Sequence, residues 1–160
     1  IFNRKTKEEL RQLGIARGTA SVELNDRELA RIGIEEQVFV AYGYQPVMIS
    51  AGCIQKTSAS CDGKGGVLSI SDRYQKKFAV RRYCRDCYNV MYNSAPLFLA
   101  DKAEEVHALA PAELRLDFTT ESSGQVKEIC HAYTLAFEKG CKTEPPMQDY
   151  TRGHFKRGVK

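Results

Sequence analysis

The sequence predicts an α/β fold of βα repeats, interrupted by a cysteine-rich β-hairpin. Apolar residues follow the spacing of strands and helices in turn over residues 1–52 and again over 93–141. Such alternation is typical of a parallel sheet covered by helices. Glycines and cysteines replace the helical spacing in residues 53–92, and residues 142–160 are polar and basic, which predicts a solvated C-terminal tail.

Two short helices and three strands are expected in residues 1–52. Thr6 is the expected N-cap of the first helix. The second helix is expected over 26–31, with Asn25 or Asp26 as its cap and Gly33 as its end. Strands are expected at 1–3, as the end of a strand cut short, and at 19–24 and 36–42; a second apolar stretch follows at 46–49.

The cysteine-rich segment is expected to contain a hairpin, with strands at 67–70 and 77–80 and a turn between them. After Cys87 the helical pattern is expected to return. A helix is expected over 100–109 and a strand over 113–118. The last helix begins after Ser122 or Ser123 and ends at Gly140, and its apolar face holds Val126, Ile129, Cys130, Tyr133 and Phe137.

Three or four βα units are too few for a closed eight-stranded barrel. The chain is therefore expected to form either a small open sheet or part of a barrel whose other units are missing. It begins with Ile1 rather than Met, which indicates a processed or deliberately cut piece. Unpaired barrel edges in such a piece would favour a homo-oligomer that covers them.

Composition narrows the class of protein. The chain has 160 residues, of which 42% are hydrophobic and 28% charged, as expected for one soluble globular domain. No apolar run reaches the roughly 20 residues of a membrane span, so no membrane partner is expected. The net charge of +4 is too small to indicate a nucleic-acid partner by itself. Six cysteines without a secretory signal indicate a reducing compartment, the cytoplasm.

Four cysteines form the main chemical signal. Seven residues separate Cys53 from Cys61, and Cys84 and Cys87 form a CxxC pair whose sulfurs share one tight turn. Four thiolates suit Zn²⁺ or an iron–sulfur cluster. The alternatives are a redox CxxC motif or four unrelated buried cysteines. Cys130 lies on an apolar helix face, which predicts packing in the core.

Several segments, in order along most of the chain, resemble one known family. They are Glu23–Asn25, the stretch AYGYQPVMIS at 41–50 leading into Cys53, CRDCYN at 84–89, LRLDF at 114–118, and TRGHFKRGV at 151–159. The sequence is similar to the collagenase-like peptidases, peptidase family U32. The resemblance implies the C-terminal part of a TIM-barrel protein, with the missing N-terminal half of the same protein as its partner.

The resemblance leaves three functions open. The first is a peptidase, a hydrolase of protein or peptide substrates, whose active site is shared with the missing half, so that this piece alone is inactive. The second is a hydroxylase acting on RNA, because some relatives hydroxylate RNA bases or ubiquinone precursors with a 4Fe-4S cluster on four cysteines. The third is a zinc-stapled binding module without catalysis.

Catalytic candidates come from the expected strand ends and from the tail. Glu23, Arg115 and Asp117 lie in or at the end of expected strands, where barrel enzymes carry their active sites. A buried structural Arg–Asp pair is the alternative. His154 is a further candidate, whereas His107 and His131 are expected at helix surfaces. The sequence contains neither GxSxG nor HExxH.

The tail also supplies candidates for binding an anionic substrate. These are Arg152, Lys156 and Arg157, three cations within six residues of one another. The alternative is that these charges stay in water, as most runs of charge do.

Overall fold

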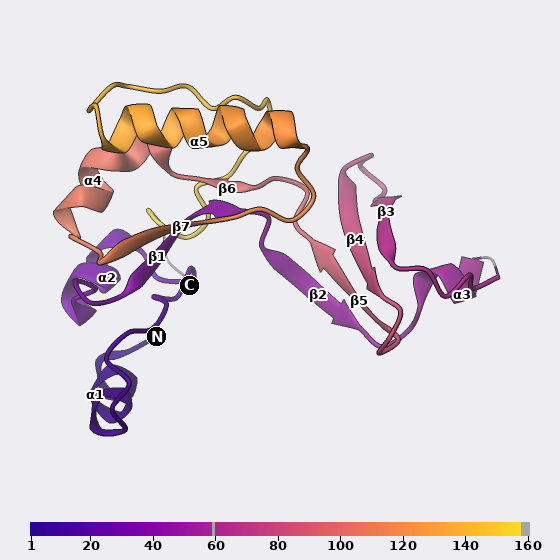
Figure 1. The fold of residues 1–160 in the computed structure, drawn as a ribbon, viewed down its shortest axis with the longest axis horizontal. Helices are drawn as coiled ribbons and strands as arrows, with labels where there is room; N and C mark the ends of the chain where they lie inside the picture. The colour runs from indigo at the N-terminus through magenta and orange to yellow at the C-terminus, as the bar shows by residue number, and fades with distance from the viewer. Residues whose placement is uncertain (59, 158–160) are drawn as a thin grey trace. The chain divides into compact units, whose positions relative to one another are not determined.

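The computed structural model describes residues 1–58 and 60–157, which form two compact units (Figure 1). Unit 1 consists of Ile1–Gly43 together with the chain from Leu97 onward. Unit 2 consists of Tyr44–Pro96. The expected mixture of helices and strands is confirmed. The described helices include none that is long and apolar enough to cross a membrane.

Unit 1 is built around a three-stranded sheet in the order β6-β1-β7. β1 (Val38–Gly43) pairs in parallel with β7 (Glu113–Asp117) and antiparallel with β6 (Leu97–Phe98). The expected parallel pairing therefore holds for β1 and β7. Figure 1 shows the long helix α5 lying along this sheet. The helices of unit 1 are α1 (Arg4–Gln12), α2 (Asp26–Ile32), the short 3-10 helix η1 (Ala100–Lys102), α4 (Ala103–Ala108) and α5 (Ser123–Phe137).

Local capping signals set the starts of these helices. Asn25, one of the two predicted caps, begins α2, and Ser122, one of the two predicted start residues, caps α5. Each forms a complete capping box. The prediction of Thr6 as the cap of α1 is wrong. Asn3 caps this helix, because its Oδ1 accepts a hydrogen bond from the amide of Thr6 at 2.9 Å.

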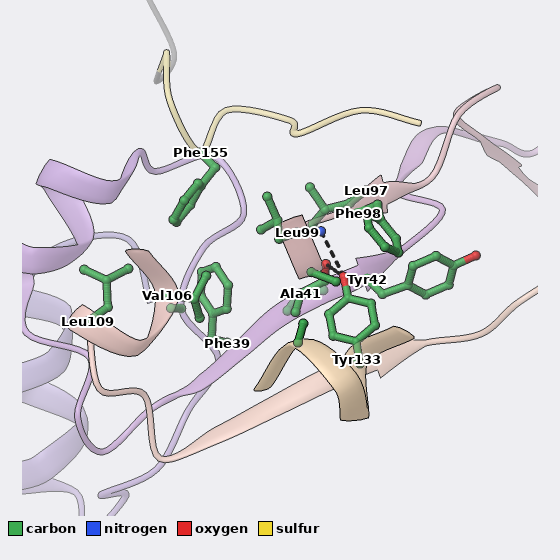
Figure 2. Packing of buried hydrophobic residues seen from close by; sticks show 14 of the residues in the cluster. Phe39, Ala41, Tyr42, Leu97, Phe98, Leu99, Val106, Leu109, Tyr133 and Phe155 are labelled. Carbon is green, nitrogen blue, oxygen red and sulfur yellow. Dashed lines mark hydrogen bonds between the residues drawn. The ribbon is translucent and has the colours of Figure 1, made fainter. Parts of the chain in front are cut away.

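The core of unit 1 lies between the sheet and its helices (Figure 2). On α5 the side chains of Ile129 and Tyr133 are buried, as predicted. The Tyr133 hydroxyl accepts a hydrogen bond from the Leu99 amide at 2.9 Å and donates one to the Ala41 carbonyl at 2.7 Å. Burial raises the pKa of Tyr133, so the hydroxyl keeps its proton and can donate. One hydroxyl thus joins α5 to β1 and to the segment after β6.

Replacing Tyr133 with Phe is expected to lower the free energy of unfolding by about 2 kcal/mol, because the buried Leu99 amide and Ala41 carbonyl both lose a partner. Urea unfolding followed by circular dichroism measures the change. Tyr74→Phe is the control, since the Tyr74 side chain is exposed. Equal stability of the two variants would contradict the role assigned to the Tyr133 hydroxyl.

The prediction of a solvated tail is wrong for the segment around Phe155. Phe155 is 3% exposed and packs edge-to-face on Phe39 in the core, with ring centroids 5.9 Å apart. Its carbonyl accepts the Asp26 amide at 2.8 Å. Thr151 forms a parallel bridge with Leu97 in β6. A lone aromatic residue in a basic segment has no periodic pattern, so composition alone hides this packing. Residues 158–160 of the expected tail lie outside the described residues.

Unit 2 is a four-stranded antiparallel sheet in the order β2-β5-β4-β3. The expected hairpin strands correspond to β3 (Gly66–Ser71) and β4 (Lys77–Tyr83). The other strands are β2 (Pro46–Ser50) and β5 (Tyr88–Tyr92), and a short helix, α3 (Ile54–Ser58), follows β2. The unit begins at Tyr44 rather than at the expected Cys53, because β2 pairs with β5.

Two further expectations about secondary structure are wrong. The segment 19–24 forms only a bridge at Thr19 to Val38, followed by a turn. After Cys87 the chain forms β5 instead of a helix. Tyr and Val in this strand favour extended structure, and β4 and β2 pair with it on either side. Pairing with strands distant in sequence therefore decides the structure of this segment.

Candidate metal centre

The topology of unit 2 brings its four cysteines to one end of the sheet. Cys53 follows the end of β2 and Cys84 follows the end of β4, whereas Cys61 precedes β3 and Cys87 precedes β5. Neighbouring strands run antiparallel in the order β2-β5-β4-β3, so these four strand ends lie at the same end of the sheet. This end, where Cys53, Cys61, Cys84 and Cys87 lie, is the cysteine edge. The two pairs predicted from the sequence are therefore brought to the same side of one sheet.

The CxxC pair forms the turn between β4 and β5. Tyr83 and Tyr88 face each other across the end of this hairpin, with stacked rings 4.6 Å apart. The Asp86 amide donates to the Tyr83 carbonyl at 3.2 Å. Cys87 closes the turn with a φ of 53°, in the left-handed region that non-glycine residues seldom adopt. A redox CxxC motif usually opens a helix, so this turn does not support the redox alternative.

Two loops are fastened to the same edge. The carbonyl of Gly52, beside Cys53, accepts a hydrogen bond from the Asn89 side chain at 2.8 Å. In the other loop, the Lys64 carbonyl lies 3.2 Å from the Cys84 sulfur. Asp62, next to Cys61, pairs with Arg82 of β4 at 3.2 Å. The first contact holds the residue before Cys53 near the start of β5. The other two hold the residues after Cys61 near the end of β4.

The thiols of this edge interact electrostatically. Burial raises the pKa of the Cys84 thiol, and the neighbouring Cys61 and Cys53 thiols raise it further, while the Arg82 guanidinium opposes both effects. The pKa of Asp62 is lowered, first by its hydrogen bond from the Lys64 amide and also by Arg82. The ionisation of the Cys84 thiol thus responds to two of the other three cysteines, Cys53 and Cys61.

The donor chemistry fits a soft metal, although the side chains are not gathered around a single point. Within residues 1–58 and 60–157, no three His, Cys, Asp or Glu side chains stand in the arrangement of a bound ion. The Cys84 and Cys87 thiols instead point to backbone carbonyls. Cys61 and Cys87 are exposed, which argues against four cysteines buried in a core. Thiolates on four strand ends are a donor set for Zn²⁺ or an iron–sulfur cluster.

Cys130 and Cys141 belong to unit 1 and not to the unit of these four cysteines. The prediction that Cys130 packs in the core is wrong, because its side chain is exposed on α5. The buried face of that helix passes through Ala132 and Ala136 instead. These two cysteines therefore provide natural controls for the four in unit 2.

Two of the four catalytic candidates are joined to each other. Arg115 and Asp117 form an ion pair along β7, with Nε and Oδ1 2.8 Å apart, and Arg115 also donates to the Thr19 hydroxyl at 3.1 Å. The pair is partly exposed, so it is not a buried structural pair. Glu23 is exposed in the turn before α2, and His154 is exposed beside Phe155. As predicted, His107 and His131 are also exposed.

The predicted anion-binding residues lie on the packed C-terminal segment. Arg152 donates twice to Asp101, at 2.6 and 2.9 Å. Lys156 lies 2.7 Å from Asp26 and 3.5 Å from Glu105. Arg157 is exposed. Carboxylates of the same unit therefore face two of these three cations, which lowers the attraction that they exert on an outside anion.

Replacing Lys156 with Met is expected to lower the free energy of unfolding at pH 7 by less than 1 kcal/mol, the range of exposed ion pairs. Lys156 lowers the pKa of Asp26, so the pair stabilises the fold above the ordinary pKa of an aspartate, about 4. The difference from wild type should disappear as the pH falls through the lowered pKa. Denaturant titrations between pH 2 and pH 7, with Arg157→Met as the control, measure it; a pH-independent difference would contradict the ion-pair explanation.

Sequence reasoning missed two polar clusters. One is at the carboxyl ends of β1 and β7, where the Glu121 carboxylate accepts the Tyr42 hydroxyl at 2.8 Å and two backbone amides. The other is Arg82 with Asp62. The available signal was their place in the sequence, Asp62 next to Cys61 and Arg82 two residues before Cys84.

Comparison with protein-family models, with curated proteins and with solved structures found no match for this chain.

Proposed function

We propose that unit 2 is a metal-binding module in which Cys53, Cys61, Cys84 and Cys87 hold Zn²⁺ or a 4Fe-4S cluster. The observation that carries the proposal is the position of all four cysteines at one edge of a single antiparallel sheet. Loops that meet at such an edge need only local rearrangement to bring their sulfurs to one ion.

The small core of unit 2 also favours a structural metal. Among its described residues, the buried hydrophobic side chains are Val80, Val90 and Tyr92, apart from Pro96 at its boundary. A unit of this size with so little apolar burial gains only modest stability from its core. Metal binding by cysteines at the sheet edge would supply the stabilisation that this core lacks.

Four thiolates would fill the coordination of a zinc ion, so no position would remain for a reacting water. The same four ligands would complete the iron sites of a 4Fe-4S cluster, which supplies electron transfer. The centre is therefore structural or electron-carrying, and any hydrolysis takes place elsewhere in the protein.

We propose further that the chain is the C-terminal part of a barrel protein similar to the collagenase-like peptidases. The ordered segments that resemble this family support the proposal, as does the parallel pairing of β1 with β7. The partly exposed Arg115–Asp117 pair at the end of β7 is the candidate for the shared active site. The second candidate function is a hydroxylase that acts on RNA in the cytoplasm. The same four cysteines favour it, because they could hold its 4Fe-4S cluster.

Metal content tests the first proposal. The protein purified without oxygen is expected to contain either one zinc, or iron and sulfide in the ratio of a cluster. Replacing Cys84 or Cys87 with Ser should remove most of the metal, because these ligands share the preformed turn. The double replacement of Cys130 and Cys141 with Ser is the matched control. Metal-free wild type under these conditions, or full metal content in both the Cys84→Ser and the Cys87→Ser variant, would contradict the proposal.

Peptidase activity needs a separate test with a longer chain that supplies the rest of the barrel. If the protein is a peptidase, the longer chain is expected to hydrolyse gelled collagen. This activity should be lost when Asp117 is replaced with Asn or Glu23 with Gln. Replacement of Glu8 with Gln is the control, since Glu8 pairs with Arg4 on the outer face of α1. Base hydroxylation of RNA by the same preparation would favour the second candidate instead.

A further inference from the structure

Arg82 is an unusual residue at the cysteine edge. Its side chain is 9% exposed, although it lies in β4 only two residues before Cys84. Its cross-strand partner in β5 is Asn89, which is itself buried. The guanidinium has thus been removed from water at the one edge of the sheet that carries the cysteines.

The contacts of Arg82 place its guanidinium among the cysteine loops. Nη1 lies 3.2 Å from the Asp62 carboxylate, next to Cys61. Nη2 lies beside the start of β3, where a Cβ added to Gly66 would be 3.6 Å away. Nε is buried and has no hydrogen-bond partner. One charged nitrogen is therefore satisfied by Asp62, while a second N–H group is left without an acceptor.

A buried donor without an acceptor costs about 1 to 3 kcal/mol, so such groups usually have a hydrogen-bond partner. The acceptors that a metal centre would add here are thiolate sulfurs. Four thiolates exceed the charge of a divalent ion by two negative charges, which is costly in a partly dry site. A guanidinium can compensate for this charge and donate several N–H groups in a fixed plane.

We propose that Arg82 is a positioning residue for the metal centre, donating N–H groups to the metal-bound sulfurs while Asp62 fixes the orientation of its guanidinium. This inference rests on the proposed metal-binding function and adds a residue to it. Asp62 and Arg82 would then form the outer layer that orients the ligands Cys61 and Cys84, as outer-layer residues do in other metal sites. The alternative is a buried ion pair that stabilises unit 2 with or without metal.

Cobalt titration separates these possibilities. Co²⁺ bound to thiolates absorbs in the near ultraviolet through charge transfer, and the energy of that absorption depends on hydrogen bonds to sulfur. Arg82→Met is expected to weaken Co²⁺ binding by about 10- to 100-fold, the usual effect of losing an outer-layer partner, and to shift the charge-transfer band. Arg82→Lys should recover only part of the affinity, because Lys keeps the charge without the planar set of donors. Arg81→Met is the control, since Arg81 is exposed next to Arg82 in β4.

Two outcomes would overturn the inference. Equal Co²⁺ affinity and an unshifted band in Arg82→Met would leave Arg82 with no role at the metal. An affinity loss with an unshifted band in both Arg82 variants would assign Arg82 to the stability of unit 2. Asp62→Asn keeps the guanidinium and provides the check if Arg82→Met fails to fold; it too is expected to shift the band. Failure of the wild type to bind Co²⁺, together with the absence of zinc, iron and sulfide from the protein purified without oxygen, would reject the metal-binding function itself. Co²⁺ binding that is insensitive to Arg82 would reject only this inference.

Discussion

Replacing Phe155 with Ala is expected to lower the free energy of unfolding of unit 1 by about 3 to 5 kcal/mol, the usual cost of removing a buried aromatic ring. The ring packs on Phe39 within the core, and the carbonyl of the same residue accepts the Asp26 amide at the start of α2. The loss should therefore spread beyond the C-terminal segment. Denaturant unfolding measures its size, and amide hydrogen exchange measures its location.

The exchange pattern gives this prediction its specificity. The amides of Asp26 and Phe98 donate to carbonyls of the C-terminal segment, at Phe155 and Thr151 respectively. Both amides should exchange faster in the Phe155→Ala variant, even under conditions in which the whole protein remains folded. Phe2→Ala is the control, since Phe2 is half exposed. A change in stability below 1 kcal/mol would mean that this segment is a solvated tail after all.

Replacing Gly43 with Ala is expected to cost about 3 kcal/mol or more, for two separate reasons. Gly43 has a φ of 144°, a conformation that costs other residues about 1 to 3 kcal/mol. A Cβ at this position would also lie 2.6 Å from the Asp117 carbonyl oxygen, which belongs to the backbone of β7 and cannot rotate away. The substitution should therefore push β1 and β7 apart at their carboxyl ends.

Gly124→Ala is the matched control for this substitution. Gly124 lies in the first turn of α5, and the nearest atom to an added Cβ there is 3.9 Å away. Alanine is a better helix former, so the control should be neutral or slightly stabilising. Thermal unfolding of the two variants checks the prediction, and similar melting temperatures would show that the ends of β1 and β7 tolerate a side chain at position 43.

The sequence predicts the parts of the fold that short-range chemistry determines. Asn25 with Glu28, and Ser122 with Gln125, are capping pairs that can be read from neighbouring residues, and both helices begin where these pairs predict. The CxxC pair and the hairpin before it are equally local. The convergence of all four cysteines could be predicted only as a hypothesis, because it depends on the order of four strands.

The features that the sequence did not predict depend on distant partners. β5 forms as a strand because β2 and β4 pair with it on both sides. The segment around Phe155 packs because Phe39, more than a hundred residues away, provides the contact surface. Asp62 and Arg82 each look like ordinary surface charges until the sheet brings them together. In each case a tertiary contact outweighs the local composition.

The way in which the chain leaves and re-enters unit 1 has a consequence for modularity. Gly43 and Leu97 are direct partners across β1 and β6, so residues 44–96 begin and end at a single cross-strand pair. For unit 1, the whole of unit 2 is one long hairpin loop. Loop closure costs only about 0.6 kcal/mol for each doubling of loop length. An insertion at this point therefore costs unit 1 little free energy. Unit 2 could be gained, exchanged or deleted as a whole while unit 1 keeps its sheet.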